Sequence, residues 1–200
     1  MMLKIEHVSK KFKNKEVLKD INFSIEKGEL IYLYGKNGSG KSTLLKMICD
    51  ILEPTQGKIT IAENTIIGAL IENPGYIELE SMKFNLKYLA SLTRRYDEDK
   101  IGKLCEYFEL DINDKSSMKT YSVGMRQKVG IIQAIMEDQN LILFDEPTRG
   151  LDTDSINKFQ KIVKELVLSG KSVVIASHDM MEELNFSVIY KLENGVLYKE

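Results

Sequence analysis

A glycine-rich segment that ends in a lysine and a hydroxyl residue is the part of this sequence best suited to chemistry. Residues 35–42 read Gly-Lys-Asn-Gly-Ser-Gly-Lys-Ser and satisfy the pattern G-x-x-x-x-G-K-[ST]. An apolar stretch, Leu30–Tyr34, precedes the segment, and a helix is expected from Lys41 to about Leu52. The glycines let backbone N–H groups turn inward toward phosphate oxygens, and the helix N-terminus adds partial positive charge. The segment therefore predicts a nucleotide-binding loop.

Within this loop, the lysine and the hydroxyl residue have distinct expected roles. Lys41 is placed to reach the β- and γ-phosphates, and Ser42 to ligate Mg²⁺. A turn that merely joins a strand to a helix would need neither residue. The motif alone does not distinguish a kinase, a GTPase and a transport ATPase. The predicted nucleotide-binding residues of the loop are Gly35, Asn37, Gly38, Ser39, Gly40, Lys41, Ser42 and Thr43.

Two acids follow a second apolar run, in residues 141–146, Leu-Ile-Leu-Phe-Asp-Glu. Carboxylates at the carboxyl edge of a parallel sheet lie where ligands of open α/β sheets bind. Asp145 suits Mg²⁺ binding, and Glu146 is placed to accept a proton from an attacking water. An acidic pair at a surface strand end is the alternative, which the phosphate loop disfavours. Two successive acids favour hydrolysis over transfer to a substrate hydroxyl.

The elements that must position these residues are strands and helices in alternation. Early strands are expected at Leu3–Val8 and Ile21–Ile25, with the basic stretch Lys10–Lys15 as a solvated hairpin loop. Residues 81–110 have a helical pattern, and residues 187–198 predict a closing β-hairpin. Further elements are expected at Val123–Glu137 (helix), Leu141–Phe144 (strand), Asp154–Leu168 (helix) and Ser172–Ala176 (strand). Strands separated by helices predict a parallel sheet covered on both faces.

Composition narrows the class of protein further. The formal net charge of -2 over 200 residues gives nucleic-acid binding no support. No apolar run approaches the roughly 20 residues that cross a bilayer. Cys49 and Cys105 are isolated, which predicts core residues in a reducing compartment. These features predict a soluble, intracellular protein.

Taken together and in order, these motifs resemble those of ABC ATPases over nearly the whole chain. Besides residues 35–43 and 141–147, residues 121–125 (Tyr-Ser-Val-Gly-Met) stand where the family has its signature L-S-G-G-Q. Gly150-Leu151-Asp152 matches the D-loop, His178 the switch histidine, and Phe12 the aromatic that stacks on adenine. The resemblance implies an α/β P-loop fold with a mostly parallel sheet, an N-terminal antiparallel β part and a small helical subdomain.

The resemblance also implies a dimer at work. In the family, Ser122 and the Gly124 backbone would bind the γ-phosphate held by an opposite copy, and Asp152 would act across that interface. His178 would donate to the γ-phosphate. Simple helix capping remains the alternative for Ser122 and Asp152, and simple packing the alternative for Phe12.

Some residues depart from the family pattern. Val123 and Met125 replace a signature glycine and glutamine, and Glu72 stands where the family usually has a glutamine. The Glu72 carboxylate can still ligate Mg²⁺ or orient water, but it adds negative charge to the site. The segment from Ile71 to Gly75 and the altered signature are similar to those of the bacitracin and lantibiotic self-protection branch of exporters. We expect a single domain, with residues 1–72 and 121–200 as the ATP-binding core and 73–120 as the helical subdomain.

The function that the resemblance implies is an ATP-hydrolysing subunit that uses ATP and Mg²⁺ and energises a separate membrane permease. It would work as a homodimer or pseudo-dimer on the cytoplasmic face of the membrane, and export of a peptide antibiotic or similar compound is expected. The main alternative is a soluble ABC ATPase of DNA repair or translation. A small-molecule kinase would not need Ser122, Gly124, Asp152 and His178 in this order.

Overall fold

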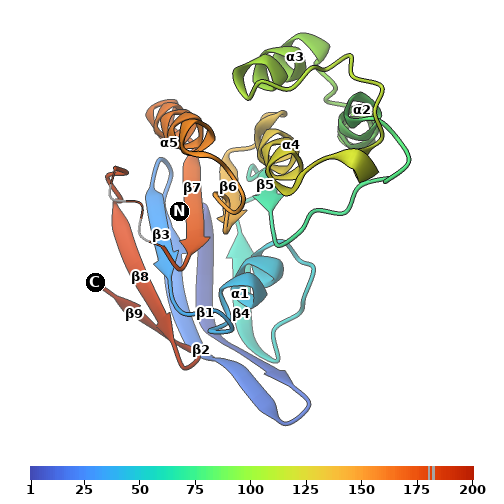
Figure 1. Cartoon of the computed structure of the whole chain (residues 1–200). Helices are drawn as coiled ribbons and strands as arrows, with labels where there is room; N and C mark the ends of the chain where they lie inside the picture. The colour runs from blue at the N-terminus through green and yellow to red at the C-terminus, as the bar shows by residue number, and fades with distance from the viewer. Residues whose placement is uncertain (180, 182) are drawn as a thin grey trace.

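The chain forms two sheets and a group of helices in a computed structural model that describes residues 1–179, 181 and 183–200 (Figure 1). One sheet is antiparallel, with the order β2-β1-β4, and the other has the order β5-β6-β7-β3-β8-β9. The strands are β1 (Leu3–Phe12), β2 (Lys15–Ile25), β3 (Leu30–Tyr34), β4 (Gln56–Ile61), β5 (Ile67–Leu70), β6 (Leu141–Asp145), β7 (Ser172–Ser177), β8 (Val188–Glu193) and β9 (Val196–Lys199). The helices are α1 (Lys41–Ile48), α2 (Met82–Thr93), α3 (Glu98–Tyr107), the 3₁₀ turn η1 (Met118–Thr120), α4 (Val123–Ile135) and α5 (Thr153–Leu168).

The larger sheet is parallel except at its end, where β9 runs antiparallel to β8. In β6 and β7 every residue is buried, which explains why both read as apolar runs without alternation. Because side chains alternate between the faces of a strand, Leu141 and Leu143 pack in one core cluster while Ile142 and Phe144 pack in another. The predicted α/β fold with a mostly parallel sheet and an antiparallel N-terminal part is confirmed.

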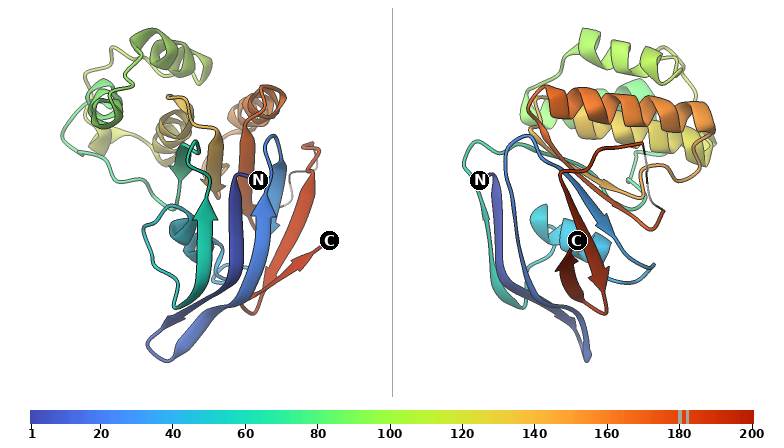
Figure 2. Two further views of the ribbon diagram at one scale, coloured as in Figure 1. Left: turned by 180° about the vertical axis from the view of Figure 1, so that it is seen from behind. Right: turned by 90° about the vertical axis from the view of Figure 1, so that its left-hand side faces the viewer.

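Those two core clusters define the layers. The first cluster joins the inner face of the antiparallel sheet, helix α1 and one face of the parallel sheet, so α1 lies between the sheets. The second joins the opposite face of the parallel sheet to α4 and α5 (Figure 2). The carboxyl ends of β3 and β6 therefore meet the N-terminus of α1 at one edge of the molecule, as open α/β sheets place their ligand sites.

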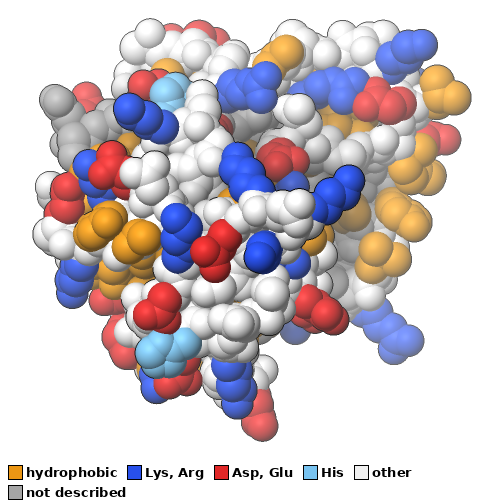
Figure 3. All heavy atoms as spheres, turned by 90° about the horizontal axis from the view of Figure 1, so that it is seen from below, with side chains coloured by type: hydrophobic (Ala, Val, Ile, Leu, Met, Phe, Trp, Pro, Cys, Tyr) orange, Lys and Arg blue, Asp and Glu red, His pale blue; other side chains and the backbone are white. Residues whose placement is uncertain are grey.

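Helices α2 and α3 lie beyond α4, away from the sheet (Figure 1). Their inner faces continue the second core cluster, with Met82, Leu86 and Ala90 of α2 fully buried. The apolar stripe of Phe84, Tyr88 and Leu92 instead faces outward, and Leu92 is 67% exposed. Hydrophobic side chains gather at the surface along the right edge of Figure 3, the side on which Figure 1 draws α2. A contiguous group of exposed apolar side chains of this kind is typical of an interaction surface.

Several sequence predictions about element ends are wrong. The basic stretch Lys10–Lys15 forms a loop only at its two-residue turn, 13–14, because β1 runs to Phe12, β2 starts at Lys15, and these two residues pair directly. Alternation lets the lysines of a strand point into water while the backbone remains paired. Helix α1 stops at Ile48 rather than Leu52, and Cys49 closes it. No helix in the described part of the chain is both long and apolar enough to cross a membrane.

Candidate active site

The predicted phosphate loop, residues 35–40, connects β3 to α1. Gly40 is the N-cap residue of α1 and has a φ of 111°, a conformation that favours glycine. A Cβ on Gly35 would lie 2.3 Å from the carbonyl oxygen of Leu192, so only glycine allows this loop to pass so close to β8. The first N–H groups of α1 have no partner within the helix and point toward the loop. Together they form a concave surface with partial positive charge.

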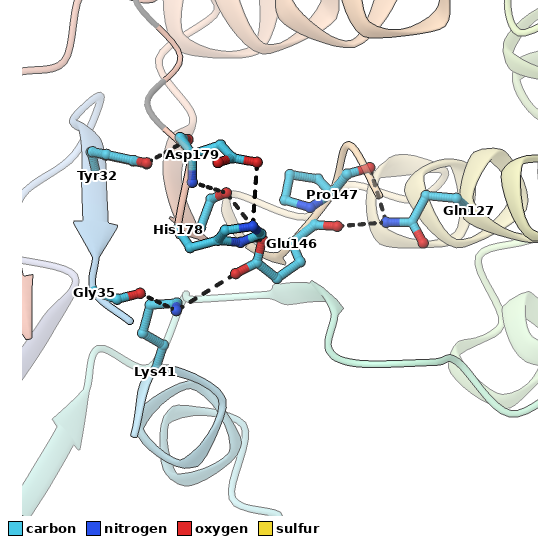
Figure 4. A network of polar contacts seen from close by, with 9 residues as sticks. Tyr32, Gly35, Lys41, Gln127, Glu146, Pro147, His178 and Asp179 are labelled. Atoms are coloured by element: carbon cyan, nitrogen blue, oxygen red, sulfur yellow. Dashed lines mark hydrogen bonds and ion pairs between the residues drawn. The ribbon is translucent and has the colours of Figure 1, made fainter. Parts of the chain in front are cut away.

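Lys41 is buried at the start of α1, with 5% of its surface exposed. Its Nζ donates to the carbonyl oxygen of Gly35 at 2.7 Å and lies 3.5 Å from Oε1 of Glu146 (Figure 4). A buried ammonium is costly unless it is paired, so these oxygens hold its charge. The side chain is consequently fixed beside the loop and next to the acid of β6.

Asp145 ends β6 and is 3% exposed. Burial is the main cause that raises the pKa of its carboxyl, and the nearby Ser42 hydroxyl and Lys41 ammonium lower it. A divalent cation would relieve the cost of burying this charge. Hydroxyl and carboxylate oxygens are also the donors that Mg²⁺ prefers, completed by water and substrate oxygens. The oxygen set of Ser42 and Asp145, with Glu72 nearby, therefore fits Mg²⁺.

Glu146 follows β6 in a left-handed conformation, with a φ of 47°. For a residue other than glycine this costs about 1–3 kcal/mol and persists only when the surroundings impose it. Its N–H donates to the Ala176 carbonyl at 2.8 Å, and its Oε2 accepts from the Ser177 hydroxyl at 3.1 Å. The same Oε2 lies 2.8 Å from Nδ1 of His178 (Figure 4). Its Oε1 is buried without a hydrogen-bond partner among the described residues. Hydrogen bonds thus hold one carboxylate oxygen, while the other faces the Lys41 ammonium and accepts no hydrogen bond from the described residues.

His178 lies just after β7, with 47% of its side chain exposed. One ring nitrogen contacts Glu146, and the other, Nε2, lies 3.3 Å from a carboxylate oxygen of Asp179. Tyr32 fixes this turn, because its hydroxyl donates to the Asp179 carbonyl at 2.6 Å. Burial first, and then the charge of Glu146, raises the pKa of Tyr32 to about 12, so the hydroxyl keeps its proton. The histidine ring is therefore oriented by groups on both sides.

Two hollows flank the phosphate loop. A pocket of about 310 Å³ is lined by Lys41, Ser42, Asp145, Glu146 and Glu72 together with Val17, Asn37, Gly38, Gly40 and Thr43. A larger one of about 930 Å³ lies between the loop, His178 and the strands β2 and β8. The smaller pocket contains the residues predicted to bind Mg²⁺ and to activate water, so it is the candidate place for hydrolysis. The structure thus brings together the predicted residues of the phosphate loop, the acids and the histidine.

Other predicted residues lie outside both hollows. Phe12 is at the tip of the β1–β2 hairpin, 43% exposed, with the Lys10 ammonium 5.0 Å from its ring centre. Ser122 and Asp152 cap their own helices, accepting from the N–H groups of Met125 at 3.2 Å and Ser155 at 2.7 Å. The capping alternative is therefore realised, and a role toward nucleotide for these residues stays a prediction.

Glu72 at the edge of the smaller pocket also has a left-handed backbone, with a φ of 53°. Its carboxylate pairs with the Lys46 ammonium of α1 at 2.8 Å. The cation offsets the negative charge that Glu72 adds beside Asp145. Nothing in the sequence motifs pointed to Lys46, although its place one turn after Ser42 puts it on the neighbouring surface of α1.

Sequence analysis missed four residues that shape the site: Val17, Tyr32, Ser177 and Gln127. Val17 lines both hollows. Gln127 is 7% exposed, and its Nε2 donates to the carbonyl oxygens of Glu146 at 3.0 Å and Pro147 at 2.9 Å (Figure 4). One signal was available for Gln127. It is a polar residue on a helical stripe whose later members, Gly130, Ile131 and Ala134, are buried.

Comparisons with known proteins agree with this geometry. A family model described as ABC transporter matches residues 18–149. The uncharacterized ABC transporter ATP-binding protein YdbJ of Bacillus subtilis (strain 168) is 35% identical over 192 residues, which are 90% of this chain but 62% of that protein. The ABC transporter ATP-binding protein NatA of the same strain is 35% identical over 219 residues, 99% of this chain and 89% of that protein.

A third relative is the lantibiotic transport ATP-binding protein SrtF of Streptococcus pyogenes. It is 31% identical over 188 residues, 90% of this chain and 82% of that protein. Among solved structures, a dimeric post-hydrolysis state of the ATP-binding cassette MJ0796, bound to ADP and Pi, has a TM-score of 0.89. It is 26% identical, and the match covers 100% of this chain and 98% of that one.

Proposed function

This chain belongs to the ABC transporter family of ATP-binding proteins, and from that premise we propose that it hydrolyses ATP to drive a membrane partner. One observation carries the proposal. The Glu146 carboxylate lies between the Lys41 ammonium and the His178 ring, in front of a phosphate loop. A nucleotide-binding loop alone would serve many reactions, whereas this arrangement supplies a base, a cation and a donor for hydrolysis.

Binding would place the phosphates of ATP, the substrate, on the loop. Lys41 would exchange the Gly35 carbonyl for phosphate oxygens, and the N–H groups of residues 38–43 would donate to them. Ser42 and Asp145 would hold Mg²⁺, with Glu72 as a further oxygen ligand, and the metal would neutralise charge on the β- and γ-phosphates. Phe12 would stack on adenine after the hairpin tip approaches.

In the hydrolytic step, a water oxygen bonds to the γ-phosphorus while the bond to the bridging oxygen of ADP breaks. The proton released by the water moves to Glu146, whose Oε1 accepts no hydrogen bond from the described residues. Ser177 and His178 hold the other carboxylate oxygen. His178 would turn to donate to a γ-phosphate oxygen, so its ring would respond to the presence of the terminal phosphate.

A second copy would complete the site. Ser122 is exposed at the N-terminus of α4 and lines neither hollow of its own chain. Its hydroxyl and the Gly124 N–H would bind the γ-phosphate of an opposite copy, and Asp152 would contact that copy. The dimeric cassette of known structure supports this arrangement by similarity. ATP would then lie between two copies arranged head to tail.

The membrane partner would be a separate permease, contacted by the helical subdomain that we assign to residues 73–120. The outward stripe of Phe84, Tyr88 and Leu92 gives that subdomain an apolar surface. The ATPase would then act from the cytoplasmic face of the membrane. Export of a peptide antibiotic or similar compound has support from SrtF, a lantibiotic transport protein. The rival function is a soluble ABC ATPase of DNA repair or translation.

The dependence of ATPase activity on protein concentration tests this proposal. If two copies share each ATP, specific activity rises with concentration until the dimer is saturated. A specific activity that is constant over a hundredfold range, with light scattering showing only monomers in Mg·ATP, would contradict it. Copurification with a multi-span membrane protein separates transport from the rival function.

A further inference from the structure

Gln127 connects α4 to the backbone of the residue that we propose as the general base. Its side-chain amide donates one hydrogen bond to the Glu146 carbonyl and one to the Pro147 carbonyl. The amide is buried, so water does not compete for these bonds. Pro147 has no N–H and its φ is fixed, so the two carbonyls are presented in a restricted geometry.

The Glu146 backbone needs such a support. Its left-handed conformation is unfavourable for a side chain as large as glutamate. The N–H side is tied to the Ala176 carbonyl of β7, and the carbonyl side accepts from Gln127 and from the N–H of Arg149 at 3.2 Å. Gln127 is the side chain that bridges Glu146 and Pro147. Loss of this bridge would let the peptide rotate and carry the carboxylate away from its present direction.

A second contact joins the same helix to the same loop. A Cβ on Gly124 would lie 2.5 Å from the Gly150 carbonyl oxygen. The start of α4 therefore contacts the loop after β6 at two points, through Gly124 at Gly150 and through Gln127 at Pro147. On its other side, α4 is bound to the segment before α2: Arg126 donates to Glu78 at 2.8 Å, and the Tyr76 hydroxyl donates to the Arg126 carbonyl at 3.0 Å. A shift of α4 would therefore carry Gln127, and with it the Glu146 peptide.

The geometry points to Gln127 as a positioning residue for hydrolysis, which sets the direction of the Glu146 carboxylate from the helix that begins with Ser122. This inference rests on the proposed role of Glu146. Through Gln127, the start of α4, where Ser122 and Gly124 would bind the phosphate of a second copy, is connected to Glu146 of the same chain. Gln127 itself touches no reacting atom.

The test compares Gln127→Leu and Gln127→Glu with Gln133→Leu as the control, all in the full chain. Gln133 lies on the same helix, and its Oε1 has no hydrogen-bond partner among the described residues. Leucine removes the donors at similar size, and glutamate replaces them with oxygens that repel the two carbonyls. We expect both Gln127 variants to lower kcat about tenfold or more with KM for ATP changed less than about threefold. Gln133→Leu should keep kcat, because it removes an amide whose buried oxygen accepts no hydrogen bond from the described residues.

Two further measurements separate positioning from a structural role and from failure of the proposed function. Thermal denaturation should show Gln127→Glu folded at the assay temperature, and Gln127→Leu added to Glu146→Gln should cause no further loss, because both act through one carboxylate. If Glu146→Gln abolishes turnover but both Gln127 variants keep kcat, the inference fails while the proposed function stands. If Glu146→Gln leaves turnover unchanged, both fail. Losses that appear only in KM, or equally in Gln133→Leu, also overturn the inference.

Discussion

The hydrolysis end and the signature end of this chain satisfy their polar groups in different ways. At the hydrolysis end, Lys41, Glu146 and His178 contact one another across three elements that are distant in sequence. At the signature end, the Ser122 hydroxyl accepts a hydrogen bond from the N–H of Met125, three residues along its own helix. The fold of one copy therefore assembles the first group, while the second projects from the surface. We therefore expect substitutions to lower activity most where side chains contact one another within one copy. A side chain at the surface affects activity only through the partner that binds it.

The largest effect is expected at the hydrolysis end, from Glu146→Gln. Glutamine keeps the size of the side chain but cannot take the proton of water, so turnover should fall by a factor of about 10²–10⁴. Nucleotide binding should remain, and ATP-bound dimers should accumulate because they no longer hydrolyse their substrate. Phosphate release measures turnover and light scattering measures the dimer. An unchanged rate of hydrolysis would show that Glu146 is not the general base, and would contradict the distinction drawn between the hydrolysis end and the signature end.

The second-largest effect is expected from Lys41→Ala, which should lower the affinity for Mg·ATP. Lys41 is the buried cation of the loop, and a hydrogen bond to a charged group is worth about 1.5–3 kcal/mol, or roughly a 10- to 150-fold change in affinity. Calorimetric titration with Mg·ATP measures this loss. Lys36→Ala is the control, because Lys36 is an exposed lysine of the same loop. Equal ATP affinity in the two variants would contradict the phosphate role of Lys41.

A comparison of two serines then tests the signature end. Ser122 and Ser81 both cap a helix by accepting an N–H bond at 3.2 Å, from Met125 in α4 and Phe84 in α2. Ser→Ala at either position should cost about 1 kcal/mol of stability, since each loses an N-cap. Ser122→Ala should also lower kcat several-fold, whereas Ser81→Ala should not. Equal activity in the two variants would leave Ser122 with capping alone.

The contrast between the two ends also explains which features were readable from sequence. The strands β3, β6 and β7 were predicted to within one residue, because strands buried on both faces leave continuous apolar runs. The glycine-lysine-serine loop and the two acids are local patterns that carry their own chemistry. The contacts of Gln127, Tyr32 and Ser177 with the site are not local: each depends on register between elements more than 18 residues apart, which spacing along one helix or strand does not encode.

The smallest effect on activity is expected from changes at Glu72. This residue is intermediate between the hydrolysis end and the signature end, because its carboxylate is paired within the chain but lies at an exposed position. Its bond to Lys46 joins side chains that are 54% and 28% exposed, so the pair contributes little to stability. Glu72→Gln and Lys46→Gln should therefore leave the melting temperature nearly unchanged.

If Glu72 ligates Mg²⁺, Glu72→Gln should raise the Mg²⁺ concentration needed for half-maximal ATPase activity a few-fold, because a neutral amide binds the ion more weakly. Lys46→Gln should lower that concentration or leave it unchanged, since it frees the carboxylate. Should both variants shift the Mg²⁺ requirement in the same direction, the ion pair would be the functional unit, and Glu72 would belong with the internally satisfied groups.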